Sequence, residues 1–107
     1  MQKVNSRKIV EIVSSKSEVV DVEIDNIVSD SRAIKDGDLF VAIKGEKNDG
    51  HDYVAEVLKN GAALVLVNHV VDGAPVERQI VVENTIKAYG EIGAYNRSLF
   101  KGTVIGL

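Results

Sequence analysis

The sequence contains no cysteine and no tryptophan, and it has a single proline. Without cysteine the chain cannot form a disulfide, a zinc finger or a thiol nucleophile, and nothing points to secretion. No apolar run approaches the roughly 20 residues of a membrane-spanning helix, and residues 1–8 lack the apolar core of a signal peptide. We therefore expect a cytoplasmic protein that does not bind a membrane.

Motifs for nucleotide-phosphate and metal binding are also missing. Neither G-x-x-x-x-G-K-[ST] nor G-x-G-x-x-G occurs anywhere in the chain. Asp49, His51 and Asp52 fit a helix start with a capping aspartate better than a metal centre, so we expect no metal site. Sixteen acidic residues outweigh 13 basic ones, which is a poor electrostatic match to nucleic acid.

What is present is the composition of one globular domain: 107 residues, 45% hydrophobic and 27% charged. The hydrophobic pattern alternates between helical spacing and strand-like runs. We expect helices over residues 6–14, 50–60 and from 85 onward, and strands over 20–24, 27–28, 39–43, 62–67 and 80–82. Inward positions of the last helix are expected at Ile86, Tyr89, Ile92 and Leu99. The pattern predicts a single small α/β domain with a mixed or parallel sheet flanked by about three helices.

Two polar segments interrupt these apolar elements. Asp30-Ser31-Arg32 follows the strand at 27–28, and its guanidinium could hold a phosphate or carbonyl with Asp30 orienting it. The alternative is an aspartate–arginine pair that only fixes the turn. Residues 44–51 lie between a buried strand and a helix start, where open α/β sheets bind ligands and free N–H groups favour an anion. The alternative here is a connection whose glycines only permit the turn. If the two strands are neighbours, both segments form one polar site.

Several of these residues form a longer pattern that resembles a known family. D-S-R at 30–32, G-D-L-F-V-A at 37–42, Gly45, D-G-H at 49–51 and G-A at 61–62 are similar in order and spacing to the N-terminal domain of the Mur ligases. These are the ATP-dependent amide ligases that build the peptide of bacterial cell-wall precursors. The resemblance covers about a third of the chain directly, and the flanking elements fit the remainder.

The resemblance implies a division of function between domains. In the family, the carboxylate of a UDP-muramoyl peptide is phosphorylated with Mg-ATP and an amine attacks the acyl phosphate. The central and C-terminal domains supply the ATP and Mg²⁺ sites, and the N-terminal domain holds the UDP-sugar. Residues 1–102 would be that UDP-sugar-binding domain, inactive alone and without a cofactor of its own. Residues 103–107 would be the first strand, or a stub, of the central domain.

The tail resembles the member that adds the D-alanyl-D-alanine dipeptide to UDP-N-acetylmuramoyl-tripeptide. There, V-I-G-[IL], as at 104–107, is followed at once by the phosphate-binding loop. The alternatives are the member that adds the third amino acid, and a stand-alone module that binds a UDP-sugar or a protein.

Candidate site residues follow from the resemblance by position. Ser31 and Arg32 would lie at the uridine or diphosphate. Glu46, Lys47 and Asn48 would form a loop over the nucleotide, although Glu46 fits uracil or ribose better than a diphosphate. Gly45 and Gly50 would shape that loop, and Asp49 and His51 would start the helix beneath it.

Overall fold

The computed structural model describes residues 3–45 and 48–99, with the backbone alone for 96–99. Its centre is a four-stranded sheet in the order β3-β4-β5-β6, and every neighbouring pair is parallel. These strands are Ile27–Val28, Leu39–Val41, Leu64–Val67 and Gln79–Val81. A separate antiparallel pair joins β1 (Val4–Asn5) to β2 (Glu23–Ile24). The predicted α/β fold with a mixed or parallel sheet is confirmed.

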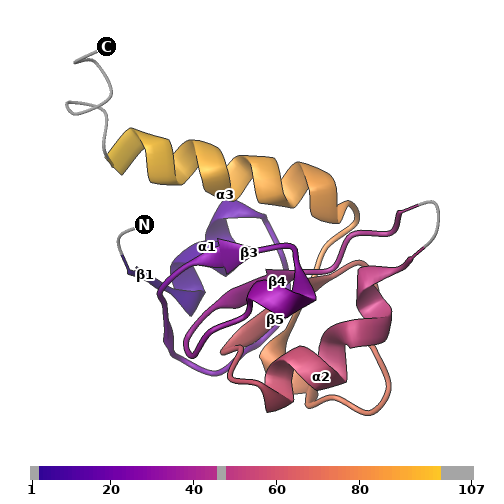
Figure 1. The fold of residues 1–107 in the computed structure, drawn as a ribbon. Coiled ribbons are helices and arrows are strands. Elements are labelled where there is room, and N and C mark those ends of the chain that lie inside the picture. The colour runs from indigo at the N-terminus through magenta and orange to yellow at the C-terminus, as the bar shows by residue number, and fades with distance from the viewer. Residues whose placement is uncertain (1–2, 46–47, 100–107) are drawn as a thin grey trace.

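Three α-helices cover the central sheet in two layers. They are α1 (Ser6–Ile12), α2 (Val54–Lys59) and α3 (Thr85–Leu99). α1 and α3 lie on one side of the sheet and α2 on the other (Figure 1). Single 3-10 turns, η1 (Ser31–Ala33), η2 (Gly50–Tyr53) and η3 (Val76–Arg78), complete the described secondary structure.

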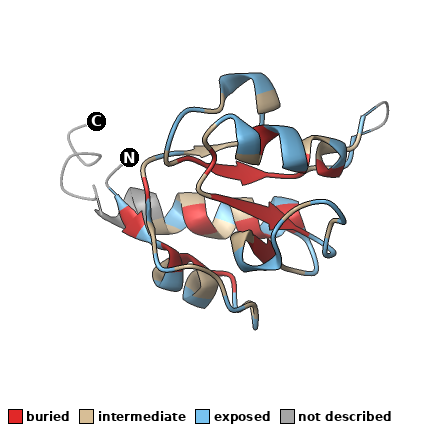
Figure 2. Ribbon diagram, turned by 90° about the horizontal axis from the view of Figure 1, so that it is seen from below, coloured by how far each residue is buried: buried red, intermediate tan, exposed pale blue. Residues whose placement is uncertain are grey.

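The two middle strands are buried on both faces, which explains their continuous apolar sequence. Because side chains alternate along a strand, Leu64 and Leu66 of β5 pack with α1 and α3, whereas Val65 and Val67 pack with α2. All four are fully buried. Figure 2 shows buried strand residues in red between the helices. This buried core fixes the ends of the strands, from which the loops of a site can extend.

The helices begin and end at residues that cap them. The Asn84 side chain accepts a hydrogen bond from the Lys87 amide at 3.0 Å at the start of α3. α2 ends at Asn60-Gly61, where Gly61 has φ +116°, a conformation that a side chain disfavours. The first turn of the predicted helix over 50–60 is a 3-10 turn, with Asp49 as its cap.

Two local predictions were wrong. The strand expected over 20–24 is reduced to Glu23–Ile24, because Val20 bonds outside any ladder: its N–H donates to Glu77 and its carbonyl accepts from the Ser6 hydroxyl. Ile86 is 61% exposed instead of inward, and Ala88 is buried in its place because it shares a helix face with buried Ile92.

Two further predictions fall outside what the structure describes. The Leu99 side chain and the strand expected over 103–107 lie outside the described residues, so the predicted domain boundary there remains a prediction. Within residues 3–45 and 48–99, no helix combines the length and hydrophobicity needed to cross a membrane.

Candidate functional site

Both predicted polar segments follow parallel strands and meet at one edge of the sheet. β3 ends at Val28 and leads into Asp30-Ser31-Arg32, which we call the Arg32 turn. The neighbouring strand β4 leads into the loop that ends at Asp49-Gly50-His51, the His51 turn. Because β3 and β4 run parallel and pair directly, their carboxyl ends place the two turns side by side.

The Arg32 turn is held by one carboxylate. Asp30 accepts hydrogen bonds from the Arg32 amide at 2.9 Å, from its Nε at 3.2 Å and from its Nη2 at 3.3 Å. The side-chain hydrogen bond from Arg32, followed by the backbone one, lowers the pKa of Asp30, and the same carboxylate raises the pKa of Arg32. The arginine side chain remains 89% exposed. The Asp30–Arg32 pair is thus present, as both predicted roles of this segment require, and its role toward a ligand stays a prediction.

The Arg32 turn leaves donors available to a ligand. A guanidinium has five N–H donors, and Asp30 engages only Nε and one N–H of Nη2. Within the described part of the chain, the Ser31 hydroxyl makes no hydrogen bond. An anion or a carbonyl at this turn could therefore accept from both side chains without breaking the Asp30 pair.

The His51 turn has the same local bonds in a buried setting. Asp49 accepts from the His51 amide at 3.0 Å and lies 2.6 Å from the His51 ring nitrogen Nδ1. The amide bond, followed by the ring bond, lowers the pKa of Asp49. Only 4% of the His51 side chain is exposed. Its Nε2 accepts from the Asn68 amide at 3.0 Å, just after β5, and the His69 ring stacks on it at 4.6 Å.

The loop between β4 and the His51 turn closes on itself. The Gly45 amide donates to the Asn48 carbonyl at 2.7 Å, and the Gly50 amide donates to the Ile43 carbonyl at 2.9 Å. A Cβ atom on Gly50 would lie 2.7 Å from the Ile43 nitrogen, so no side chain fits there. The predicted role of Gly50 in shaping this loop thus has a steric cause. Glu46 and Lys47 lie outside the described residues.

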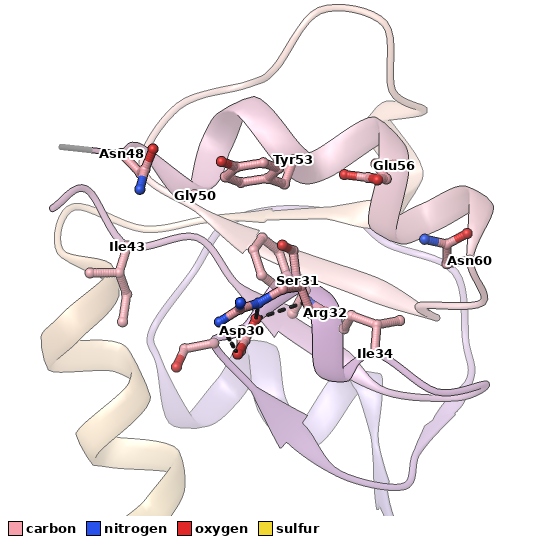
Figure 3. Close-up of a pocket in the computed structure, with 12 residues that line it drawn as sticks. Asp30, Ser31, Arg32, Ile34, Ile43, Asn48, Gly50, Tyr53, Glu56 and Asn60 are labelled. Atoms are coloured by element: carbon pink, nitrogen blue, oxygen red, sulfur yellow. Dashed lines mark hydrogen bonds and ion pairs between the residues drawn. The ribbon is translucent and has the colours of Figure 1, made fainter.

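A cavity of about 750 Å³ opens between the two turns. Figure 3 shows the Arg32–Asp30 pair on one side and Tyr53, Glu56 and Asn60 on the other. Its lining combines an apolar floor with polar groups: Ser29, Asp30, Ser31, Arg32, Ile34, Phe40, Ile43, Asn48, Gly50, Tyr53, Glu56 and Asn60. Of the predicted site residues, Ser31, Arg32 and Asn48 line the cavity, whereas Gly45, Asp49 and His51 lie in the framework behind it.

The sequence prediction missed the wall that α2 contributes. Tyr53, Glu56 and Asn60 are spaced three and four residues apart and therefore share one face of the η2–α2 helix. That spacing was visible in the sequence, but no motif marked these three residues as part of a site. The tyrosine is half-buried, so its ring contributes to the core as well as to the cavity.

A cluster of metal-ligating side chains and a phosphate-binding loop are both missing from the described residues. Residues 3–45 and 48–99 hold no group of three or more histidine, aspartate or glutamate side chains that could bind a metal ion. The whole sequence has no phosphate-binding loop with its lysine. The cavity offers the Arg32 guanidinium, hydroxyls and amides beside the Asp30 and Glu56 carboxylates and apolar side chains, a mixed lining typical of sites for polar organic ligands.

Residues 23–97 match the Mur ligase family, catalytic domain. The chain belongs to the Mur ligase family. Two bacterial Mur ligases are similar to it at 39% identity over 88 residues. One is UDP-N-acetylmuramoyl-tripeptide–D-alanyl-D-alanine ligase of Synechocystis sp., with 81% of this chain and 19% of the relative covered. The other is UDP-N-acetylmuramoyl-L-alanyl-D-glutamate–2,6-diaminopimelate ligase of Caldanaerobacter subterraneus subsp. tengcongensis, with 80% and 18% covered.

A solved Mur ligase has the same fold. The structure of MurF from Acinetobacter baumannii superposes with a TM-score of 0.80 at 33% identity, covering 92% of this chain and 22% of that one. The chain thus spans about a fifth of the length of the Mur ligases that it matches. The predicted family and fold are confirmed. The predicted link to the ligases of peptidoglycan synthesis is confirmed as well.

Proposed function

We propose that this chain binds the UDP-sugar end of UDP-N-acetylmuramoyl-tripeptide, as the substrate-binding part of a ligase that adds D-alanyl-D-alanine in the bacterial cytoplasm. The observation that carries the proposal is the cavity between the Arg32 turn and the His51 turn. It lies at the carboxyl edge of a parallel sheet, the edge at which such sheets bind ligands. A dipeptide-adding and a diaminopimelate-adding ligase, both named for UDP-N-acetylmuramoyl peptides, match the chain across this region.

The donors at the cavity suit a nucleoside diphosphate. Arg32 and Ser31 would donate to the diphosphate or to a uridine carbonyl, and Asn48 would contribute its amide from the facing loop. The apolar floor around Phe40 and Tyr53 would cover a flat ring or a sugar face. Contacts from Glu46 and Lys47 remain predictions. Gly45, Asp49 and His51 would support the loop without touching the ligand.

The chain alone would not catalyse ligation. ATP and Mg²⁺ would bind elsewhere in a longer ligase, as membership of the Mur ligase family implies. The partners would then be the muramoyl peptide and the central and C-terminal domains of the same protein. An isolated chain that releases phosphate from ATP would contradict this division.

A second candidate has support of its own. The 39% identity to a diaminopimelate-adding ligase equals that to the dipeptide-adding one, so the third-residue-adding ligase remains an alternative with the same chemistry. The two are separated by substrate choice in the intact ligase. Phosphate release from ATP should require UDP-N-acetylmuramoyl-tripeptide with D-alanyl-D-alanine. Phosphate release that instead requires UDP-N-acetylmuramoyl-L-alanyl-D-glutamate with a free amino acid would favour the alternative.

Calorimetric titration of the 107-residue chain tests binding directly. We expect saturable binding of UDP-N-acetylmuramoyl-tripeptide, competition by UDP, and no specific heat with ATP. Absence of binding by the muramoyl peptide, or equal binding of ATP, would overturn the proposal. Binding without any ligase activity in the intact protein would instead favour a stand-alone UDP-sugar-binding module.

A further inference from the structure

His51 is a buried titratable side chain beside the cavity, yet it does not line it. We infer that His51 is a positioning residue that ties the loop beside the cavity to the end of β5 through its neutral ring with the proton on Nδ1. The inference rests on the proposed function in one respect, because the loop that it positions is the one assigned to the ligand.

The hydrogen bonds of the ring determine its tautomer. The Asn68 backbone N–H can only donate, so the Nε2 atom 3.0 Å away must be an unprotonated acceptor. The proton of a neutral ring then sits on Nδ1 and points at the Asp49 carboxylate 2.6 Å away. Both ring nitrogens are therefore used, each in a different role.

These bonds link the end of β5 to the loop that follows its neighbouring strand, β4. The Asn68 amide follows β5, and Asp49 forms an antiparallel bridge with Lys44 at the base of the loop. Next to that bridge, Gly45 donates to the carbonyl of Asn48, whose side chain lines the cavity. The position of Asn48 thus depends on Asp49, and Asp49 is held by a ring anchored to β5.

Protonation of the ring would oppose this arrangement. A proton on Nε2 would face the Asn68 N–H and remove its acceptor. The titratable groups that face the ring are the Asp49 carboxylate from the same turn and the His69 ring, which stacks on it from the segment after β5. Lys44 acts on Asp49 from the loop. The carboxylate at Nδ1 and the N–H at Nε2 together fit a ring with one proton, on Nδ1.

The test uses two substitutions that each keep one of the two bonds. In His51→Gln the amide oxygen can accept from Asn68 but the donor to Asp49 is lost. In His51→Asn the donor to Asp49 remains and the anchor to Asn68 is lost. We expect faster hydrogen exchange at the Gly45 and Gly50 amides in both variants, and affinity for UDP-N-acetylmuramoyl-tripeptide lower by about tenfold. His69→Gln, which removes the stacked exposed ring and its hydrogen bond to the Asn68 side chain, should leave hydrogen exchange and affinity unchanged because the Asn68 backbone amide still donates to His51.

Nitrogen-15 spectra of the wild-type His51 ring give a readout that requires neither a variant nor a ligand. They should show an Nδ1–H tautomer at neutral pH. An Nε2–H tautomer, or variants with wild-type exchange, would overturn the inference. If the wild type binds no muramoyl peptide, the proposed function fails, while the tautomer and the exchange rates still decide whether His51 holds the loop.

Discussion

The Arg32 turn and the His51 turn share one local geometry but differ in their surroundings. In each, an aspartate accepts from the amide two residues later, at 2.9 Å and 3.0 Å, and from the side chain of that same residue. Each aspartate begins a 3-10 turn after a strand of the central sheet. The Arg32 side chain is 89% exposed, however, whereas that of His51 is 4% exposed.

This comparison shows that the same capping bonds serve two purposes. At the exposed turn, Asp30 holds a guanidinium whose remaining donors face the cavity. At the buried turn, Asp49 holds an imidazole whose second nitrogen is already engaged by Asn68. The exposed turn therefore offers groups to a ligand, and the buried turn fixes the loop on the opposite side of the same cavity.

Exchanging the middle residues of the two turns should give the largest effect. Gly50→Ser would force a Cβ to within 2.7 Å of the Ile43 nitrogen, so we expect a loss of about 3 kcal/mol in the free energy of unfolding. Ser31→Gly has no such contact and should cost less than about 1 kcal/mol, from backbone entropy alone. Urea unfolding measures both. Equal losses would show that the buried turn is not sterically constrained.

Removing the side chain of the exposed turn should affect binding and not stability. Arg32→Ala should weaken binding of UDP-N-acetylmuramoyl-tripeptide by about tenfold, because a charge-assisted hydrogen bond is lost. Its unfolding midpoint should stay at the wild-type value, since the side chain is exposed. Arg7→Ala is a matched control: Arg7 is 80% exposed and pairs with Asp21 at 3.4 Å, away from the cavity. Equal affinities of the two variants in calorimetry would exclude Arg32 from the site.

The smallest expected effect is on stability in acid. The pKa of Asp49 lies below its usual value of 3.8, chiefly because its carboxylate accepts from the His51 amide. A lowered folded-state pKa contributes stability that is present above pH 3.8 and is lost as the pH falls through the lower folded value. The stability difference between wild type and Asp49→Asn should therefore shrink as unfolding is measured from pH 5 down to pH 2. A difference that is constant across this range would contradict the ionised cap.

Much of the sheet could be predicted because its strands are buried on both faces. Runs such as 39–43 and 62–67 have no polar face, and only a covered strand accommodates them. The strand β1 and its pairing with β2 could not be predicted, because the two residues of β1 are too few to show an alternation. Ile86 was misplaced because hydrophobicity alone cannot show that small Ala88 occupies the inward position.

The candidate site was predictable only in part. The turn residues Asp30 and Asp49 are informative because short acidic side chains cap turns in a recognisable pattern. The cavity wall formed by Glu56 and Asn60 depends on how α2 packs across the sheet, a long-range arrangement that no local motif encodes. The bond from Asn68 to His51 likewise joins residues brought together only by the folded sheet.

Mapping amide chemical shifts during a titration with UDP-N-acetylmuramoyl-tripeptide tests the central claim most directly. If the cavity between the two turns binds the UDP-sugar, the perturbed amides should cluster at Ser31, Arg32 and residues 44–51, with no such cluster when ATP is added. Saturable shifts confined to other parts of the chain, such as α3, would contradict the site.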